Sequence, residues 1–369
     1  MVDFHFMTRP TRRTLLLAGP ALFAASAKSR SKLARVNVAP NRVIRSIAGL
    51  RPFRPSGFVV RGEKLDSKTV IHNYGHGGAG ITLSWGTAHL AVEEGAKSGA
   101  RECAVVGCGV VGLSTARLLQ LRGYSPVIYA KAMPPETTSN VAGGLWEPTS
   151  LYDRPQVSET FLRQFPEAAR FAFRRYQSLT GDLYGVRWIP LYTLSTNGPY
   201  TPPPAGNPYF EIDQLYPESQ ILRKEDHPFH VSYAHRRQTM LIEPAIYLNA
   251  LIRDFFLAGG RIVIRDFASA REIAALKEDL IFNCTGLGAR TLFGDQELTP
   301  IRGQLVFLLP QPEIDYCTIG PNNTYMFPRR DGILLGGTFD RGVSATDPDP
   351  AITDRILHDN GDLFSKMRT

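Results

Sequence analysis

Three glycines spaced as G-x-G-x-x-G are the residues whose types and spacing most clearly imply chemistry. Gly107, Gly109 and Gly112 stand in the stretch VVGCGVVGLSTARLL. In this pattern the first glycine permits a tight turn, the second lets backbone N–H groups approach a pyrophosphate, and the third allows close helix–strand packing. The N-terminus of the following helix, which begins with Val110 and Val111, then faces the anion. The motif predicts a dinucleotide-binding site.

The elements needed to position this turn flank it on both sides. An apolar strand is predicted over residues 103–106, a helix with apolar residues at helical spacing extends to Gly123, and a second strand covers residues 126–130. Lys131 stands about where an acidic residue would hold a ribose hydroxyl. A lysine there could instead meet a 2′-phosphate, so NADP stays open as a rival to FAD.

The composition is that of a globular protein with two or three domains. Of the 369 residues, 43% are hydrophobic and 21% are charged, which argues against disorder and against a membrane-spanning architecture. Lysines and arginines are scattered apart from a cluster at residues 28–35, so the net charge of +8 favours a solvated surface over nucleic-acid binding. The four cysteines lie far apart and are interpreted as packing residues rather than a disulfide or zinc framework.

The first 27 residues resemble an export signal. Arg12 and Arg13 precede an apolar run over residues 15–25, and small residues at positions 25–27 resemble a cleavage site. The paired arginines favour a twin-arginine route, an export machinery as partner, and a periplasmic or secreted location. A plain secretory signal or an uncleaved anchor is the alternative, and the location is cytoplasmic if the signal is not used. The apolar run is too short to span a bilayer comfortably.

Several further motifs become specific when they are considered together. They are GLRP (49–52), HNYGHGGAGIT (72–82), TTSNVAGGLWEP (137–148), NCTG (283–286), RGQ (302–304), YMFP (325–328) and LGGTF (335–339). With the glycine fingerprint they resemble the D-amino-acid oxidase family of FAD-dependent oxidases over most of the chain. In that family GLRP and HNYGHGG follow LGGTF, whereas here they precede the fingerprint. The order resembles a circular permutation in which the natural termini are joined near residues 97–102.

The resemblance implies an α/β fold with two domains. One is a Rossmann-like FAD-binding domain, and the other is a sheet-rich substrate domain with mixed or antiparallel strands. We expect the FAD-binding domain at residues 40–150, joined by residues 271–297. We expect the substrate domain at residues 151–270 and 298–345, and a C-terminal tail or helix over residues 346–369.

The resemblance also implies which residues hold the substrate. Arg51 in GLRP matches the arginine that clamps the substrate carboxylate, for which a guanidinium offers two parallel charge-assisted hydrogen bonds. Arg54 and Arg61 lie nearby in the sequence and are less favoured candidates for this role. Tyr325 matches the active-site tyrosine, and Gly78 matches the residue whose backbone carbonyl faces the amine. Where mammalian members carry another tyrosine, four residues before Tyr325, this chain has a proline, residue 321, a departure from the family pattern that bears on the lid and the substrate range.

The FAD contacts that the resemblance implies come from short glycine-rich and hydroxyl-rich segments. The residues expected to bind FAD are Gly77, Gly78, Gly80, Ile81, Thr82, Gly107, Gly109, Val110, Val111, Gly112, Ala130, Lys131, Thr137, Thr138, Ser139, Gly144, Leu145 and Trp146. No metal site is expected, because His72 and His76 have no third ligand in sight.

The implied reaction is the oxidation of a D-amino acid at Cα, with hydride transfer to flavin N5 and no acid or base in the site. Reoxidation by O2 gives hydrogen peroxide, and the imine hydrolyses to a 2-oxo acid and ammonia. An NADP-dependent dehydrogenase and a degenerate flavin-binding protein without turnover are kept as alternatives. Arg329 and Arg330 could help an acidic substrate, but exposed charge is the preferred interpretation. A homodimer is compatible with the sequence.

Overall fold

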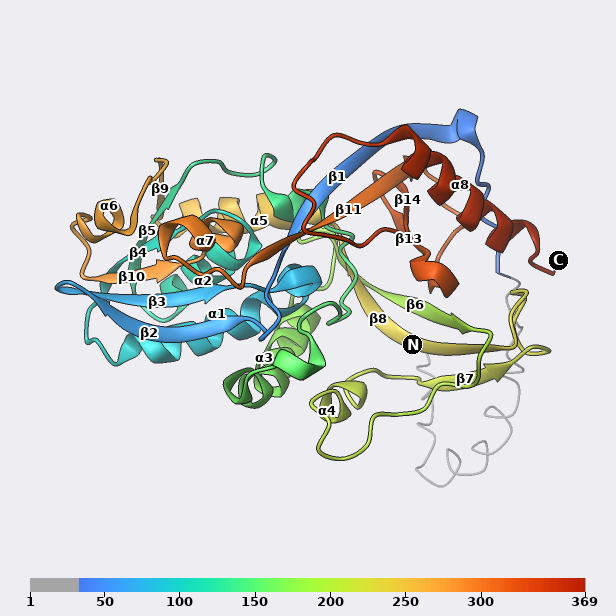
Figure 1. Cartoon of the computed structure of the whole chain (residues 1–369), viewed down its shortest axis with the longest axis horizontal. Coiled ribbons are helices and arrows are strands. Elements are labelled where there is room, and N and C mark those ends of the chain that lie inside the picture. Colours follow the sequence, from blue (N-terminus) through green and yellow to red (C-terminus); the bar gives the residue numbers. More distant parts are fainter. Residues whose placement is uncertain (1–32, 369) are drawn as a thin grey trace, which may run out of the picture. The chain divides into compact units, whose positions relative to one another are not determined.

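The computed structural model describes residues 33–368, whose chain folds into two β-sheets covered by helices (Figure 1). The predicted export signal at residues 1–27 lies outside the described residues. None of the helices formed by residues 33–368 has the length and hydropathy that a membrane span requires.

The first sheet is built on the strands that flank the glycine fingerprint. In the described part of the chain it has six strands in the order β2-β3-β10-β4-β5-β9, and all neighbours are parallel except β2 and β3. Its central strands are apolar along their length because both faces are covered. The strands are β2 (Val59–Leu65), β3 (Lys68–Tyr74), β4 (Glu102–Val106), β5 (Ser125–Ala130), β9 (Arg261–Ile264) and β10 (Leu280–Asn283).

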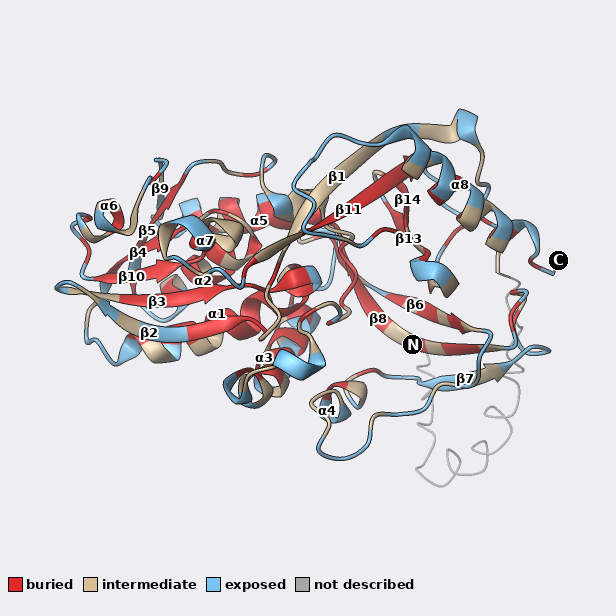
Figure 2. Ribbon diagram, in the orientation of Figure 1, coloured by how far each residue is buried: buried red, intermediate tan, exposed pale blue. Residues whose placement is uncertain are grey.

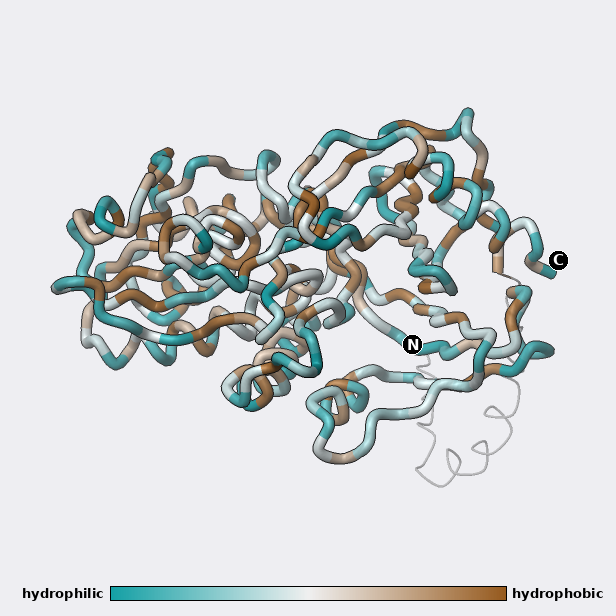
Figure 3. Tube along the Cα trace, in the orientation of Figure 1, coloured by the Kyte–Doolittle hydropathy of each residue, from teal (hydrophilic) through white to brown (hydrophobic). Residues whose placement is uncertain are grey.

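Helices cover this sheet on both faces. The helices α1 and α2 pack against one face, with α3 and α5 behind them, while α6 and α7 supply apolar residues to the other face. Their bounds are α1 (Gly80–Ala96), α2 (Val110–Leu121), α3 (Glu159–Ser178), α5 (Pro244–Leu257), α6 (Ala270–Ala274) and α7 (Ala289–Leu292). The central strands are therefore buried in Figure 2 and hydrophobic in Figure 3.

The second sheet has mostly antiparallel strands. Among the described residues its order is β1-β11-β14-β13-β12-β6-β8-β7, with β15 also paired to β11, and β12 and β6 are the parallel neighbours. Its strands are β1 (Val43–Phe53), β6 (Val186–Ser195), β7 (Gln220–Arg223), β8 (Tyr233–Ile242), β11 (Thr299–Leu308), β12 (Cys317–Ile319), β13 (Tyr325–Arg329), β14 (Gly332–Gly336) and β15 (Asp340–Arg341). The C-terminal helix α8 (Pro350–Ser365) packs against β11 and β14, and the short α4 (Phe210–Asp213) packs against α3.

Two of the expected domain ranges divide differently between the sheets. The strand β1 lies within residues 40–150, yet it pairs with β11 in the second sheet. Conversely, β9 and α5 lie within residues 151–270, yet β9 pairs with β5 in the first sheet and α5 packs against α2. A strand joins the sheet that pairs its backbone and buries its apolar face, which need not be the sheet of its neighbours in sequence.

Candidate active site

A cavity of about 920 Å³ is lined by residues from both sheets. The glycine fingerprint forms one part of its wall, and strands β1, β11 and β13 of the second sheet contribute another. The predicted site residues that line it are Arg51, Gly77, Gly78, Gly80, Ile81, Gly107, Gly109, Val110, Val111, Ala130, Lys131, Thr137, Thr138, Ser139, Gly144, Leu145 and Tyr325. The structure therefore brings most of the predicted cofactor and substrate residues to one cavity.

The fingerprint has the backbone geometry that an anion requires. Gly107 has a φ of +115°, and a Cβ there would lie 2.4 Å from the carbonyl oxygen of Cys284, so this turn needs glycine. Helix α2 begins after Gly109, which provides no side-chain cap, and the N–H of Val110 donates to Oγ of Ser139 at 2.9 Å. A helix N-terminus that opens on a cavity fits the pyrophosphate of a dinucleotide.

Charged groups lie at the carboxyl edge of β5 and β9, where the predicted ribose contact falls. Lys131 directly follows β5, and Arg265 directly follows β9, with its N–H donating to the carbonyl of Ala130 at 2.9 Å. Asp266 is the next residue and also lines the cavity. A carboxylate is therefore present at this edge although residue 131 is a lysine.

Two predicted cofactor residues support the cavity without lining it. Gly112 allows α2 to approach the turn, because a Cβ there would lie 2.0 Å from the carbonyl oxygen of Gly107. Thr82 is buried, and its hydroxyl lies 3.4 Å from the carbonyl oxygens of Leu145 and Glu147. Both residues fix backbone that faces the cavity.

Trp146, which the sequence predicts to contact the flavin, does not line the cavity. Trp146 is fully buried, and its ring lies against Phe173 and Tyr216 at centroid distances of 4.7 and 5.4 Å. The reason is local geometry: this segment runs extended beside β8, and side chains alternate in direction along an extended chain. Leu145 and Glu147 consequently line the cavity, while Trp146 points into the core.

Arg51 and Tyr325 lie on the same face of the second sheet. In the register, Ile47 of β1 lies opposite Leu305, and Leu305 lies opposite Gly336. Gly336 in turn lies opposite Tyr325. Residues directly opposite one another share a face, as do residues two or four apart along a strand, so Arg51 projects from the face that carries Tyr325.

Two glycines make room for these side chains. A Cβ at Gly303 would lie 2.5 Å from Nη1 of Arg51, and a Cβ at Gly336 would lie 1.9 Å from Cζ of Tyr325. The guanidinium thus rests on β11 and the phenol rests on β14. Sequence reasoning did not assign either glycine to the site, although a glycine inside a strand is a sign of close approach.

Arg51 presents an uncompensated charge to the cavity. Among the described residues it makes no ion pair; it donates a hydrogen bond to a backbone carbonyl, that of residue 338, at 3.4 Å, and it also hydrogen-bonds with the side chain of Tyr325. The alternative candidate Arg54 is instead paired with Asp295 at 2.9 Å, and Arg61 is paired with Glu63 at 2.9 Å. Of the three arginines, Arg51 alone is available to an anionic ligand.

The tyrosine beside Arg51 stays protonated near neutral pH. Burial raises the pKa of Tyr325, and the Arg51 guanidinium opposes part of that rise. Pro321, four residues before Tyr325, starts a short 3-10 turn. Two residues further, Asn323 has a φ of 60° and lines the cavity. A turn with an amide side chain therefore stands beside Tyr325.

The glycine-rich loop before α1 also borders the cavity. Gly78 lines it and donates its N–H to the carbonyl of Ser150 at 3.2 Å. Nε2 of His76 lies 2.8 Å from Oγ1 of Thr87, and burial lowers the pKa of His76 to about 3. His76 is thus a neutral, hydrogen-bonded side chain at neutral pH.

Glu147 is one of the charged residues of the wall that sequence reasoning did not assign to the site. Glu147 lines the cavity, and both of its carboxylate oxygens lie 2.7 Å from Nη2 of Arg237. The hydroxyl of Tyr216 donates to the same carboxylate at 3.0 Å. Its position directly after the GGLW motif is the signal that could have pointed to it.

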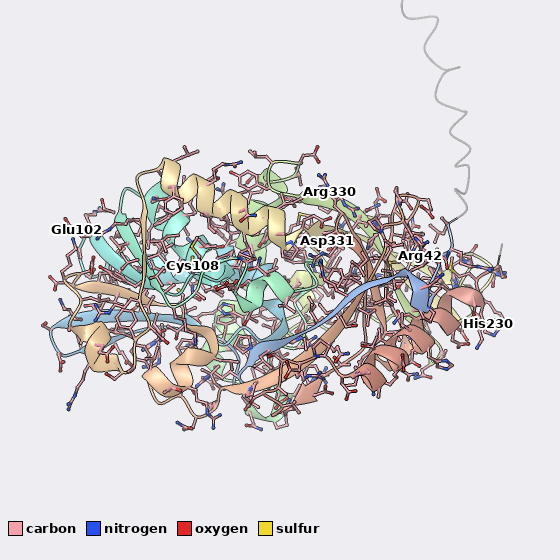
Figure 4. The ribbon with its side chains drawn as sticks, turned by 90° about the horizontal axis from the view of Figure 1, so that it is seen from above. Arg42, Glu102, Cys108, His230, Arg330 and Asp331 are labelled. Atoms are coloured by element: carbon pink, nitrogen blue, oxygen red, sulfur yellow. The ribbon has the colours of Figure 1, made fainter. Side chains whose placement is uncertain are left out.

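The two adjacent arginines at the end of β13 and in the turn after it do not line the cavity. Arg329 is buried rather than exposed as expected, because it pairs with Asp331 at 2.9 Å and donates to the carbonyl of Ala142 at 3.0 Å. Arg330 is exposed and pairs with Asp182. Figure 4 shows Arg330 and Asp331 side by side at the turn after β13.

The four cysteines are free and buried, as the sequence predicted. Cys108, inside the fingerprint, lies in the interior of the molecule in Figure 4 and is 2% exposed. Burial raises the pKa of Cys108 to about 12, so its thiol stays protonated.

The parallel sheet carries a glycine turn suited to an anion, and it shares its cavity with a second sheet that presents an arginine and a tyrosine. These features define a dinucleotide-dependent oxidoreductase. The family model for the FAD dependent oxidoreductases matches residues 8–94 and 102–368. The chain belongs to this family, it is an enzyme, and its cofactor is FAD rather than NADP.

Curated relatives and solved structures agree with this assignment. The D-amino-acid oxidase of Rubrobacter xylanophilus is 31% identical over 270 residues, covering 72% of this chain and 77% of the relative. The D-aspartate oxidase of Homo sapiens is 28% identical over 257 residues, covering 69% and 73%. The glycine oxidase of Geobacillus kaustophilus has a TM-score of 0.53 at 17% identity, covering 73% and 80%. The structural likeness shows a shared fold.

Proposed function

We propose that this enzyme oxidises D-amino acids to 2-oxo acids, with release of ammonia and hydrogen peroxide. The observation that carries the proposal is the unpaired Arg51 guanidinium beside the hydroxyl of Tyr325, in the cavity that also contains the fingerprint. A guanidinium binds a carboxylate through two parallel hydrogen bonds, so the α-carboxylate of an amino acid fits this position. The D-amino-acid oxidases among the relatives support the stereochemistry.

The chain's own residues would bind and orient the substrate. Arg51 and the protonated Tyr325 hold the carboxylate, and the backbone carbonyl of Gly78 accepts a hydrogen bond from the amine. The side chains of Leu305 and Phe327 form an apolar part of the wall and limit the access of water. FAD, when bound, supplies the acceptor for the two electrons that leave Cα. Holding the substrate in this way places Cα and the flavin in the geometry of the reaction, so that the step becomes effectively unimolecular.

The order of the segments and the N-terminus support two further proposals. The family match falls into two pieces that break between residues 94 and 102, where α1 is linked to β4 by a short connection. This supports a circular permutation in which that connection joins the ancestral termini. The paired arginines at residues 12–13 support export by a twin-arginine route.

A peroxide-coupled screen of D- and L-amino acids on the purified, flavin-loaded chain tests the proposed function. We expect peroxide with D-amino acids and none with their L-enantiomers. Bound flavin without turnover of any D-amino acid would instead support a degenerate binding protein. Peroxide released equally from both enantiomers would contradict the proposed stereochemistry.

A further inference from the structure

The sheet face that carries Tyr325 continues toward a charged cluster. Tyr325 lies opposite Ile319, Ile319 lies opposite Thr193, and Thr193 lies opposite His235 on β8. Arg237 is two residues further along β8, so it projects from the same face as His235. This face therefore leads from the predicted carboxylate clamp across β12 and β6 to Arg237.

The cluster around Arg237 carries more negative than positive charge. The guanidinium lies 2.7 Å from both oxygens of Glu147, and Nη1 lies 3.9 Å from a carboxylate oxygen of Asp213. One cation thus serves two carboxylates. His235 does not add charge at neutral pH, because burial lowers its pKa to about 4. The neighbouring Arg236 projects from the opposite face of β8, by strand alternation.

The described residues provide no second cation for the substrate's side chain. Besides Arg51, the arginines and lysines that line the cavity are Lys131 and Arg265. Both follow strands of the first sheet, at the edge where the dinucleotide's ribose is expected. A side-chain carboxylate on the substrate would face Glu147 and the apolar residues of the wall, such as Ile319, with no partner of opposite charge.

We propose that Glu147 determines the charge of the accepted side chain: the enzyme oxidises D-amino acids with neutral or cationic side chains and discriminates against D-aspartate and D-glutamate. The inference rests on the proposed function. Glu147 occupies Arg237, the cation that this face carries besides Arg51, and the cluster leaves a net negative charge beside the cavity. A like charge brought next to it in a water-poor site is disfavoured.

The test is the ratio of kcat/KM for D-glutamine to kcat/KM for D-glutamate, two substrates of nearly the same shape. We expect a large ratio in the parent enzyme and a fall of about tenfold or more in Glu147→Gln, which removes the charge and keeps an acceptor for Tyr216. Glu218→Gln is the matched control, because Glu218 pairs with the neighbouring Arg236, at 3.4 Å, and does not line the cavity. Its ratio should equal that of the parent.

A second pair of substrates tests the same negative charge with a cationic side chain instead of an anionic one. The preference for D-lysine over D-norleucine should fall in Glu147→Gln and stay unchanged in Glu218→Gln. Because each ratio compares two substrates on the same variant, a loss of stability or of flavin lowers both kcat/KM values and leaves their ratio unchanged. Should Glu147→Gln be isolated without flavin, Asp213→Asn removes the other carboxylate of the cluster, keeps the pair of Glu147 with Arg237, and is expected to lower the preference for D-lysine as well.

The outcomes separate this inference from the proposed function. Oxidation of neutral D-amino acids with a D-glutamine to D-glutamate ratio that is unchanged in Glu147→Gln, or in Asp213→Asn where that variant takes its place, would overturn the role of the Glu147 cluster alone. A parent enzyme that prefers D-glutamate would overturn it as well. A flavin-loaded parent that is inert toward every D-amino acid would overturn the proposed function, and this inference with it.

Discussion

The substitution Gly336→Ala tests the placement of Tyr325 in the site. An added Cβ would lie 1.9 Å from Cζ and 2.3 Å from the hydroxyl oxygen of Tyr325. Carbon atoms in contact normally lie ~3.5–4.0 Å apart, so the ring has to move by roughly 1.5–2 Å. The ring borders a cavity into which it can swing, so we expect a stability cost at the low end of the ~1–3 kcal/mol typical of overpacking. A displacement of ~1 Å in a positioning group can lower catalysis by ~10²-fold.

The assay compares kcat/KM for one D-amino acid with flavin content and melting temperature. Gly336→Ala should lose activity on the order of 10²-fold while it retains FAD. Gly337→Ala is the matched control, because the nearest atom to its added Cβ, on Ile356, is 3.8 Å away. Equal activities of the two variants, with flavin bound in both, would refute the position assigned to Tyr325.

Three further predictions follow from the same geometry. Arg51→Met should retain FAD while kcat/KM falls by a factor that corresponds to ~2–5 kcal/mol, and normal activity would refute the carboxylate clamp. Gly107→Ala should be isolated without flavin, as read from its visible absorbance, whereas Gly99→Ala, also at positive φ but with open space around its Cβ, should retain it. Lowering the pH from 6.5 toward 4 should lower the melting temperature. The reason is that His235 and His76 stay neutral in the folded protein, with pKa values of about 4 and about 3, and take up protons on unfolding. His235→Gln should make the melting temperature less dependent on pH.

The fingerprint and its helix could be predicted from sequence because their signals are contiguous. The turn at Gly107, the start of α2 at Val110 and the strands on either side depend on local spacing alone. Arg51 and Tyr325, in contrast, were assigned by resemblance. Their common face depends on the pairing of β1 with β11, β14 and β13, which joins residues far apart in the chain.

The features that sequence reasoning missed depend on side-chain direction and register. Trp146 differs from Leu145 and Glu147 by one position, and that single step moves its ring from the cavity into the core. The pairing of Glu147 with Arg237 exists only because β8 runs beside this segment. Buried ion pairs of this kind have no local pattern in a single sequence.

The central claim is that the flavin-loaded enzyme accepts two electrons from a D-amino acid. The most direct measurement is the visible absorbance of the purified holoenzyme, mixed under anaerobic conditions with D-alanine, D-glutamine or their L-enantiomers. We predict that the D-enantiomers bleach the flavin bands, that the L-enantiomers do not, and that admitting O2 restores the absorbance with release of hydrogen peroxide. A flavin that stays oxidised with every D-amino acid tested would contradict the account.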